Sequence, residues 1–504
     1  MPKEKVNDGL AAYVGISAPE TPKYLLTNNF LAEYFRVPDK LLQEYTFEQF
    51  KNQGVLYTED EKNEEKLKKS FNRFLFRYLG EETIIQENRK LKQNRNSSDN
   101  KKEIKHYYFP LTQEMLCEST QTLRHILYYL QKLDKEFQYN EMQKKLEQYI
   151  FKDNSGLNHI FKILLQSSDE NADYKKEPEL PESFWRMLKP AEKNRMRKLG
   201  HQLNEDLDVL LTHEYFQKLD FYRRYHYLSM LLTSYVIQYV VVRKGSSTGI
   251  LCKGNPLDSR LDGLIHKACC NNYDDIRNLF PTLLKEYYVE AIKKLADEKG
   301  ELQLRAQDGK VWINGDTFEN FITDVMGSKI SSNGIAYKKL IIAFELTEKT
   351  ERKVTVEEFV MAYISLTGTR RGSTLTKISS VLSTSGRQLE MVYPRSNARQ
   401  KYFAMSAGLA EFYVRLYLAG QSRQYDYLDN FLEFLQERYR IVIGKTEGSG
   451  RLMKSLKPRL SARNFADNQA AFRDTLNGVN CLIKLSDSGY VITLPEEKGD
   501  FRLI

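Results

Sequence analysis

The fold of this chain is decided by the stretch from Tyr425 to Pro495, which opens with Tyr425-Asp-Tyr-Leu-Asp-Asn-Phe-Leu-Glu-Phe-Leu-Gln-Glu-Arg438. The leucines and phenylalanines of this opening recur every three or four residues, which is the spacing of one buried helical face. A short β-prone run, Tyr439-Arg-Ile-Val-Ile443, comes next and leads into a loop rich in Gly, Ser and Lys. The stretch therefore predicts a helix, a short strand and a basic loop, in that order.

A second helix is predicted from Ala462 to Leu476, with Ser461 as its N-cap. Two β-prone runs follow, Cys481-Leu-Ile-Lys-Leu485 and Tyr490-Val-Ile-Thr-Leu494, and the turn residues between them predict a hairpin. Helix, helix and hairpin is the order of a winged helix-turn-helix domain, which places its second helix in the major groove of DNA. Winged helices also serve as protein-docking modules, so both uses stay open.

The same order of elements is predicted a second time upstream. The capping box Thr355-Val-Glu-Glu358 opens one helix of this set, and a further helix follows Arg370 and Arg371. A hairpin is then predicted between residues 388 and 405, with Arg395 and Arg399 at its tip. We therefore expect a mainly α protein with small β-hairpins, in which helical regions precede C-terminal winged helix-turn-helix domains.

The length of 504 residues predicts several domains. We expect a helical N-terminal region at 1–168, with a flexible loop at 86–105 that is too polar to offset the entropy of ordering it. A charged, proline-containing linker separates it from a helical middle domain at 183–330. A possible winged helix at 335–406 and a C-terminal winged helix at 407–504 complete the predicted order.

The formal charge of +9 is concentrated between Arg370 and Arg463, where 17 Lys and Arg stand against 7 Asp and Glu. A local cationic patch is the electrostatic footprint of a protein that binds polyanions, whereas an ordinary solvated surface is the alternative. We predict that eight basic residues of this window bind DNA phosphates. They are Arg370, Arg371, Arg395, Arg399, Lys401, Lys457, Arg459 and Arg463. Arg463 and Asn468 on the second helix could add contacts to bases.

The catalytic motifs in the sequence are incomplete. Ile443-Gly-Lys-Thr446 resembles the end of a phosphate-binding loop, but Tyr439 stands where the motif needs its first glycine. Glu351-Arg-Lys353 has the spelling of a nuclease site, yet it is predicted in a charged loop, and no histidine follows His266 to assist a metal. We therefore expect a protein that is not an enzyme and that uses no cofactor.

The cysteines and the apolar segments bear on metal binding and on compartment. Cys252, Cys269 and Cys270 lie near His266, but two adjacent cysteines do not easily bind one ion, and we prefer buried thiols to a metal site. Five cysteines at irregular spacing indicate a reducing compartment. The N-terminus has no secretory segment, and the longest apolar run, residues 228–242, is too short and polar for a bilayer. We expect a cytoplasmic protein without a small-molecule substrate.

An aromatic segment in the middle of the chain allows two interpretations. Phe221-Tyr-Arg-Arg-Tyr-His-Tyr-Leu228 interleaves aromatic side chains with arginines, an arrangement that can stack on nucleotides. Aromatic residues at helical spacing more often line a core, with arginines paired to carboxylates. We favour the core.

Four strings in the chain are typical of one protein family. They are Phe221–Leu228 as quoted above, Val392-Tyr-Pro-Arg-Ser-Asn-Ala-Arg399 with Lys401-Tyr-Phe-Ala-Met-Ser406, Glu437-Arg-Tyr-Arg-Ile-Val-Ile443 and Leu485-Ser-Asp-Ser-Gly-Tyr-Val-Ile492. With these strings the chain resembles the DptG (DndG) family of accessory subunits from bacterial phosphorothioation-dependent restriction, also called the Dnd system. A similar subunit of a methylation-associated defence island is the rival resemblance. Neither covers the N-terminal part of the chain.

This resemblance implies a non-catalytic subunit of an anti-phage defence complex. Such a subunit works with ATPase and helicase-like partners to restrict double-stranded DNA that lacks the host's phosphorothioate mark. We expect a DNA-binding scaffold of this kind. The alternatives are a metal-dependent nuclease subunit, with its site in the N-terminal half, and a stand-alone winged-helix transcriptional regulator.

Overall fold

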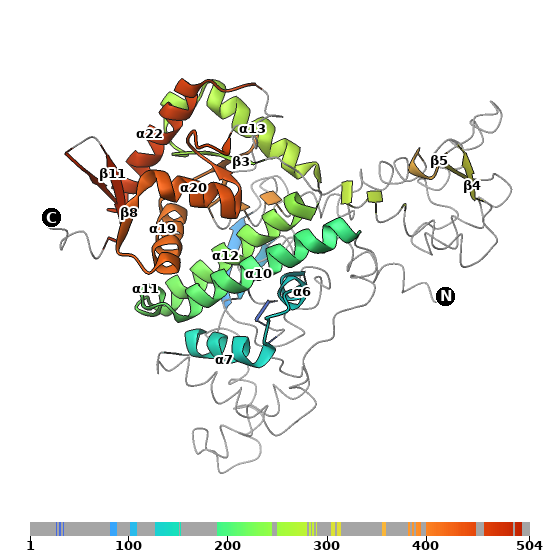
Figure 1. Ribbon diagram of the computed structural model, residues 1–504, viewed down its shortest axis with the longest axis horizontal. Helices are drawn as coiled ribbons and strands as arrows, with labels where there is room; N and C mark the ends of the chain where they lie inside the picture. The colour runs from blue at the N-terminus through green and yellow to red at the C-terminus, as the bar shows by residue number, and fades with distance from the viewer. Residues whose placement is uncertain are drawn as a thin grey trace, which may run out of the picture.

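The computed structural model describes residues 126–150, 152, 189–243, 249–279, 390–394, 400–449, 458–486 and 489–495, the backbone of four further strands, and short pieces elsewhere. This part of the chain is mostly helical, with a few small sheets, as the sequence predicted (Figure 1). None of the described helices combines the length and the apolar character needed to cross a bilayer.

Long helices form the centre of the molecule. They are α6 (Ile126–Leu133), α7 (Tyr139–Ile150), α10 (Pro190–Thr212), the short α11 (Glu214–Gln217) and α12 (Phe221–Arg243). Helix α10 packs against α6, α7 and α12, and Figure 1 shows α10 and α12 side by side. Their buried leucines, isoleucines and tyrosines belong to one core that also takes in the C-terminal helices.

Helix α12 is buried on all sides, which explains its apolar composition. Every residue from 227 to 241 is buried, as expected for a helix that is hydrophobic around its whole circumference. Ser229 and Ser234 fit this environment because their hydroxyls donate to the carbonyls of Tyr225 (2.9 Å) and Met230 (2.8 Å), one turn earlier. The apolar run is therefore the central helix of a globular core.

The core interpretation of the aromatic segment is confirmed. Tyr225 and Tyr227 are buried, with 1% and 3% of their surfaces exposed. Arg223 pairs with Glu411, whose carboxylate accepts bonds of 2.8 and 3.0 Å from the guanidinium. The described side chains of this segment, from Arg223 onward, are thus used for packing and internal ion pairing.

The crossing of α6 and α10 depends on Gly200, and we predict that a larger residue at this position destabilises the fold. A Cβ atom at Gly200 would lie 2.0 Å from the carbonyl oxygen of Leu130, so Gly200→Ala must push the helices apart. We expect the free energy of unfolding to fall by about 1–3 kcal/mol, as for overpacked cores. Gly420→Ala is the matched helical control, because its Cβ would meet only Val209 at 4.0 Å. Denaturant unfolding that shows the two variants to be equally stable would contradict this crossing.

A four-stranded mixed sheet joins distant parts of the chain. Its order is β6 (Val392–Tyr393), β7 (Tyr402–Ala404), β3 (Ile250–Lys253), β9 (Ile441–Val442). Strands β7 and β9 both pair in parallel with β3, with Cys252 opposite Phe403 and Ile250 opposite Ile441, whereas β6 and β7 are antiparallel. The apolar composition of β3 fits a strand that is covered on both faces.

Helices extend from this sheet and pack around it. They are α13 (Leu264–Arg277), which follows the 3-10 turn η4 (Ser259–Leu261), α19 (Ala407–Gln421), α20 (Leu428–Tyr439) and α22 (Ala462–Gly478). Helix α13 packs on β3 and β7, and in Figure 1 the sheet lies between α13 and α22. Helices that are far apart in the sequence, α13 and α22, therefore lie against the same sheet.

A second sheet contains the predicted C-terminal hairpin. Strands β10 (Leu482–Lys484) and β11 (Tyr490–Thr493) pair antiparallel, and β8 (Tyr425–Tyr427) adds to the other edge of β11. The prediction that residues 425–427 are helical is wrong, because the helix begins at Leu428. Asp426 explains the difference, since its carboxylate accepts bonds from Tyr417, Arg423 and its neighbours and so competes with helical geometry.

The two predicted C-terminal helices and the predicted hairpins form, but the described residues do not show a winged helix-turn-helix domain. Most of the residues of the helices predicted after Thr355 and after Arg371 lie outside the described residues. The hairpin of β6 and β7 lies inside the mixed sheet, because β7 also pairs with β3. Strand β9, between the two predicted C-terminal helices, likewise pairs with β3. Strands from the ranges 183–330, 335–406 and 407–504 thus share one sheet.

The interpretation of 86–105 as a flexible loop needs correction at both ends. Strand β1 (Glu81–Glu87) pairs antiparallel with β2 (Lys101–Tyr107), and the register places Glu87 opposite Lys101. Residues of opposite charge favour such cross-strand positions, a preference that composition alone does not reveal. The rest of the predicted loop lies outside the described residues. A further antiparallel pair forms within the range predicted as a helical middle domain, between β4 (Leu304–Gln307) and β5 (Lys310–Ile313).

Candidate nucleic-acid interface

The start of α22 carries two of the predicted phosphate-binding residues. Ser461 caps the helix as predicted, because its hydroxyl accepts from the backbone N–H of Asn464 at 3.2 Å and Asn464 Oδ1 accepts from the N–H of Ser461 at 2.9 Å. Arg459 and Arg463 lie on either side of this cap and are both exposed. The first turn of α22 thus presents two cations to solvent beside the positive end of the helix dipole.

Asn468 fixes α22 on the mixed sheet. Its Nδ2 donates to the carbonyls of Cys252 and Ile443, both at 2.9 Å, and its Oδ1 accepts from the N–H of Gly254 at 2.8 Å. These partners lie at the ends of β3 and β9, and the asparagine is 1% exposed. The prediction that Asn468 contacts DNA bases is therefore wrong, because a buried amide with these bonds is occupied by the protein's own backbone.

The contact between α22 and the end of β3 continues through Thr475. Its hydroxyl lies 2.9 Å from the carbonyl oxygen of Gly254 and 3.2 Å from that of Ala471. A Cβ at Gly254 would lie 2.2 Å from the carbonyl oxygen of Asn468, so only glycine allows the helix this close. Sheets with parallel strands commonly bind ligands at the carboxyl ends of those strands, but here α22 fills that position between β3 and β9.

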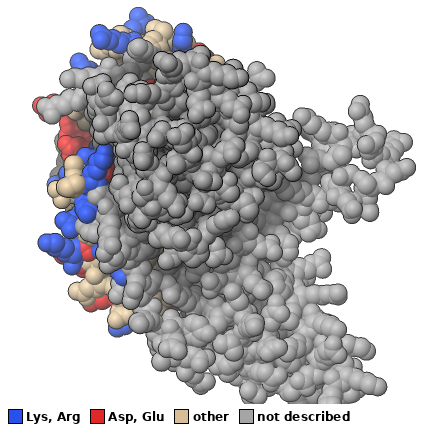
Figure 2. Space-filling model, turned by 90° about the vertical axis from the view of Figure 1, so that its right-hand side faces the viewer, with Lys and Arg blue, Asp and Glu red and all other residues tan. Residues whose placement is uncertain are grey.

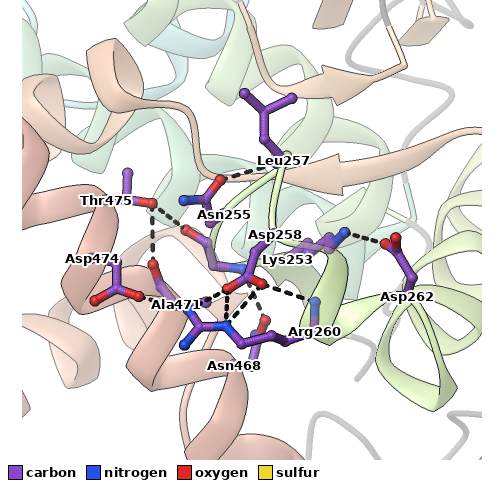
Figure 3. A network of polar contacts seen from close by, with 11 residues as sticks. Lys253, Asn255, Leu257, Asp258, Arg260, Asp262, Asn468, Ala471, Asp474 and Thr475 are labelled. Carbon is purple, nitrogen blue, oxygen red and sulfur yellow. Dashed lines mark hydrogen bonds and ion pairs between the residues drawn. The ribbon is translucent and has the colours of Figure 1, made fainter.

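The loop after β3 is braced by ion pairs, which Figure 3 shows together. Arg260 pairs with Asp258 at 2.6 Å and with Asp474 of α22 at 2.7 Å. The ammonium of Lys253, whose side chain is 2% exposed, lies 2.7 Å from Asp262. Two cations here face three carboxylates within the protein, so we do not assign this loop to the interface.

The loop that resembles a phosphate-binding motif is held by internal contacts. The hydroxyl of Thr446 bonds to the side chain of Gln436, and the N–H of Thr446 donates to Ser449 Oγ at 3.2 Å. Gly444 lies against α22, where a Cβ would be 2.7 Å from Gln469 Oε1. Lys445 follows it and is exposed. Sequence reasoning did not include Lys445 among the binding residues, although its place in the basic loop was a signal for it.

The remaining predicted residues are not brought together within the described part of the chain. Lys401 is partly buried and donates to the carbonyl of Pro394 at 3.3 Å. Burial lowers the pKa of its ammonium, and the nearby charge of Arg387 lowers it further. The other five lie outside the described residues. They are Arg370, Arg371, Arg395, Arg399 and Lys457.

Part of the charge excess counted in the sequence is neutralised inside the fold. Arg438 pairs with Asp206 at 2.7 Å and with Glu205 at 2.9 Å, and both carboxylates lie outside the basic window. Arg415, 2% exposed, pairs with Glu411 at 2.9 Å. Figure 2 likewise shows described Lys and Arg side chains beside Asp and Glu on one face. The cationic surface is therefore smaller than the sequence count suggests.

The cysteines are buried thiols, as preferred from the sequence. Cys252, Cys269 and Cys270 are at most 6% exposed, and burial raises the pKa of the Cys252 thiol to about 12. The Cys270 sulfur lies 3.5 Å from His266 Nε2, and burial lowers the pKa of that imidazole. Within the described ranges, no three His, Cys, Asp or Glu side chains are grouped to hold a metal ion.

Comparisons of the chain with models of protein families, with curated proteins and with solved structures found no match. The likeness to DptG (DndG) subunits therefore stays a prediction from the quoted strings.

Proposed function

We propose that this chain is a non-catalytic, DNA-binding scaffold subunit. The observation that carries the proposal is the exposure of Arg459 and Arg463 around the cap of α22, with Lys445 exposed in the loop that lies against the same helix. No carboxylate among the described residues pairs with these two arginines. The segment from Lys445 to Arg463 is also basic in sequence, with six Lys and Arg against one Asp or Glu.

Binding through this surface would depend on phosphate charge more than on base sequence. Lys and Arg contacts to phosphates fix orientation but carry no sequence information. Asn468 is already bonded to the sheet, which removes one side chain suited to reading adenine. In this proposal the start of α22, where Arg459 and Arg463 are exposed, lies against the DNA phosphates.

The biological setting that we propose rests on the family resemblance. In that setting the chain joins ATPase and helicase-like subunits of a bacterial anti-phage complex that restricts DNA without the phosphorothioate mark. The helical body, with its large shared core, suits a docking role beside such partners. Bond cleavage would then belong to the partners.

Charge reversal at α22 tests the proposal. We expect Arg459→Glu/Arg463→Glu to weaken binding of a labelled DNA duplex by at least about tenfold at low salt. We also expect the slope of log affinity against log salt to become shallower by about 0.9 for each phosphate that the variant no longer neutralises. Fluorescence anisotropy of the full chain, measured over a series of salt concentrations, gives both quantities.

The matched control reverses two charges at a distance from α22. Lys198 on α10 and Lys218 after α11 are both exposed, and Lys198→Glu/Lys218→Glu changes the net charge by the same amount. If the control weakens binding as strongly as the α22 variant, binding depends on net charge and the proposed surface is wrong. Unchanged affinity and salt slope in the α22 variant would also refute it.

A further inference from the structure

His201 on α10 bonds to a carboxylate through each of its ring nitrogens. Nδ1 lies 3.1 Å from Asp134 Oδ2, in the turn that ends α6, and Nε2 lies 3.2 Å from Glu205 Oε1, one turn further along α10. The histidine follows Gly200, where a Cβ would lie 2.0 Å from the carbonyl oxygen of Leu130 in α6. The ring therefore links the end of one helix to another helix at their crossing.

The charged groups around this ring are mostly acidic. Asp134 Oδ2 also accepts from Asn204 Nδ2 at 3.0 Å, and Asp134 Oδ1 accepts from the N–H of Glu136 at 3.2 Å. The carboxylate of Glu136 contributes a third negative charge near the ring. Glu205 is shared with α20, because its Oε2 lies 2.9 Å from Arg438 Nη2.

Only the protonated ring can satisfy both carboxylates. A neutral imidazole has one N–H, so its second nitrogen would direct a lone pair at a carboxylate oxygen. The hydrogen bond with Asp134 and the charge of Glu205 raise the pKa of His201, although partial burial opposes them. Burial alone would raise the pKa of Asp134, but its bonds from Asn204, Glu136 and His201 lower it. Each partner thus favours the charged form of the other.

We propose that His201 is a proton-dependent latch that holds the end of α6 on α10, closed as the imidazolium and weakened as the neutral ring. The folded form binds the proton more tightly than the unfolded chain does. The stabilisation of the folded form is therefore complete at pH values below the ordinary histidine pKa. It is lost as the pH rises through the pKa that His201 has in the folded form. Arg438 keeps its bond of 2.7 Å to Asp206 in either state, so the contact between α10 and α20 does not depend on the latch.

Hydrogen exchange of the full chain measures the latch directly. Protection of the amides of α6, corrected for intrinsic exchange, is followed from about pH 5.5 to about pH 8.5, either side of the ordinary histidine pKa. We expect the protection factor in residues 126–133 to fall about fivefold across this range, the scale of a partly exposed ion pair. Protection in residues 227–241 of α12 serves as the internal reference and stays constant.

Two substitutions of His201 distinguish the effect of its charge from the effect of its side-chain shape. His201→Gln cannot be protonated and should give low protection of α6 at every pH, whereas His201→Arg keeps a cation and should retain high protection at every pH. His213→Gln, at the other end of α10, is the control and should keep the wild-type profile. The proposal is overturned if His201→Gln keeps the wild-type pH dependence, or if His201→Arg loses protection of α6 as His201→Gln does.

Discussion

Replacing Asn468 with alanine is expected to lower the free energy of unfolding by about 3–6 kcal/mol. The substitution leaves three buried backbone groups without partners, the carbonyls of Cys252 and Ile443 and the N–H of Gly254. Each unsatisfied group costs about 1–3 kcal/mol, and the space left by the amide is too enclosed to rehydrate all three. Denaturant titration followed by circular dichroism measures the loss.

Asn468→Asp sharpens this prediction because it conserves shape. The carboxylate can still accept from the N–H of Gly254, but it places a negative charge against two carbonyl oxygens that now receive no proton. We expect it to be at least as destabilising as alanine. Asn477→Ala, at an exposed position of the same helix, is the matched control and should change stability by no more than about 0.5 kcal/mol. Equal stability of the Asn468→Ala and Asn477→Ala variants would show that α22 is not fixed in this way.

The buried position of Asn468 shows what the sequence could predict about the candidate site. Phe465 and Phe472 are apolar and buried, and Asn468 lies three residues after the first and four before the second, on the same stripe. The helical period thus placed the asparagine in the core, whereas its residue type suggested contact with bases. Ala466, one residue off that stripe, is apolar but exposed.

Features that depend on neighbouring residues were predicted well. The cap at Ser461 and the hairpin of β10 and β11 follow from local signals, and the capping box of Thr355 is also present, with Glu358 accepting from the N–H of Thr355 at 3.0 Å. Partners that are distant in sequence were not predicted. The parallel pairing of β3 with β7 and β9 joins residues far apart in the chain, and nothing in the order of helices and hairpins specifies it.

The dependence of strand pairing on partners that are distant in sequence explains why the described residues do not show the predicted winged helix. A helix, a helix and a hairpin appear in the expected order, but the strand between the helices pairs with β3 instead of remaining local. The same limit applies to charge. Counting residues showed a basic window, but it did not reveal that Arg438 pairs with carboxylates of α10. Exposed arginines were therefore fewer than the sequence implied.

Glu411 offers the second large effect, because it holds two arginines in place. Its carboxylate, 11% exposed, accepts from Arg223 at 2.8 Å and from Arg415 Nε and Nη2 at 3.0 and 2.9 Å. Arg415 also donates to the carbonyl of Tyr215 at 3.3 Å, which joins α19 to the start of α11. Glu411→Ala leaves the buried guanidinium of Arg415 without its counter-charge. We expect a loss of about 3–5 kcal/mol in the free energy of unfolding, as for other broken buried pairs.

A matched pair of variants distinguishes loss of charge compensation from general damage to the core. Glu214→Ala removes an exposed partner of Lys218, at 2.9 Å, and should leave the midpoint of unfolding nearly unchanged because solvent screens this pair. Glu411→Met/Arg415→Met removes both buried charges and fills their volume with apolar side chains. Because replacing a whole buried ion pair is often neutral, this double variant should recover most of the stability that Glu411→Ala loses. Thermal or denaturant unfolding measures the stability of both variants. If the double variant is less stable than Glu411→Ala, Glu411 stabilises the fold through packing, and the uncompensated charge of Arg415 is not what destabilises the single variant.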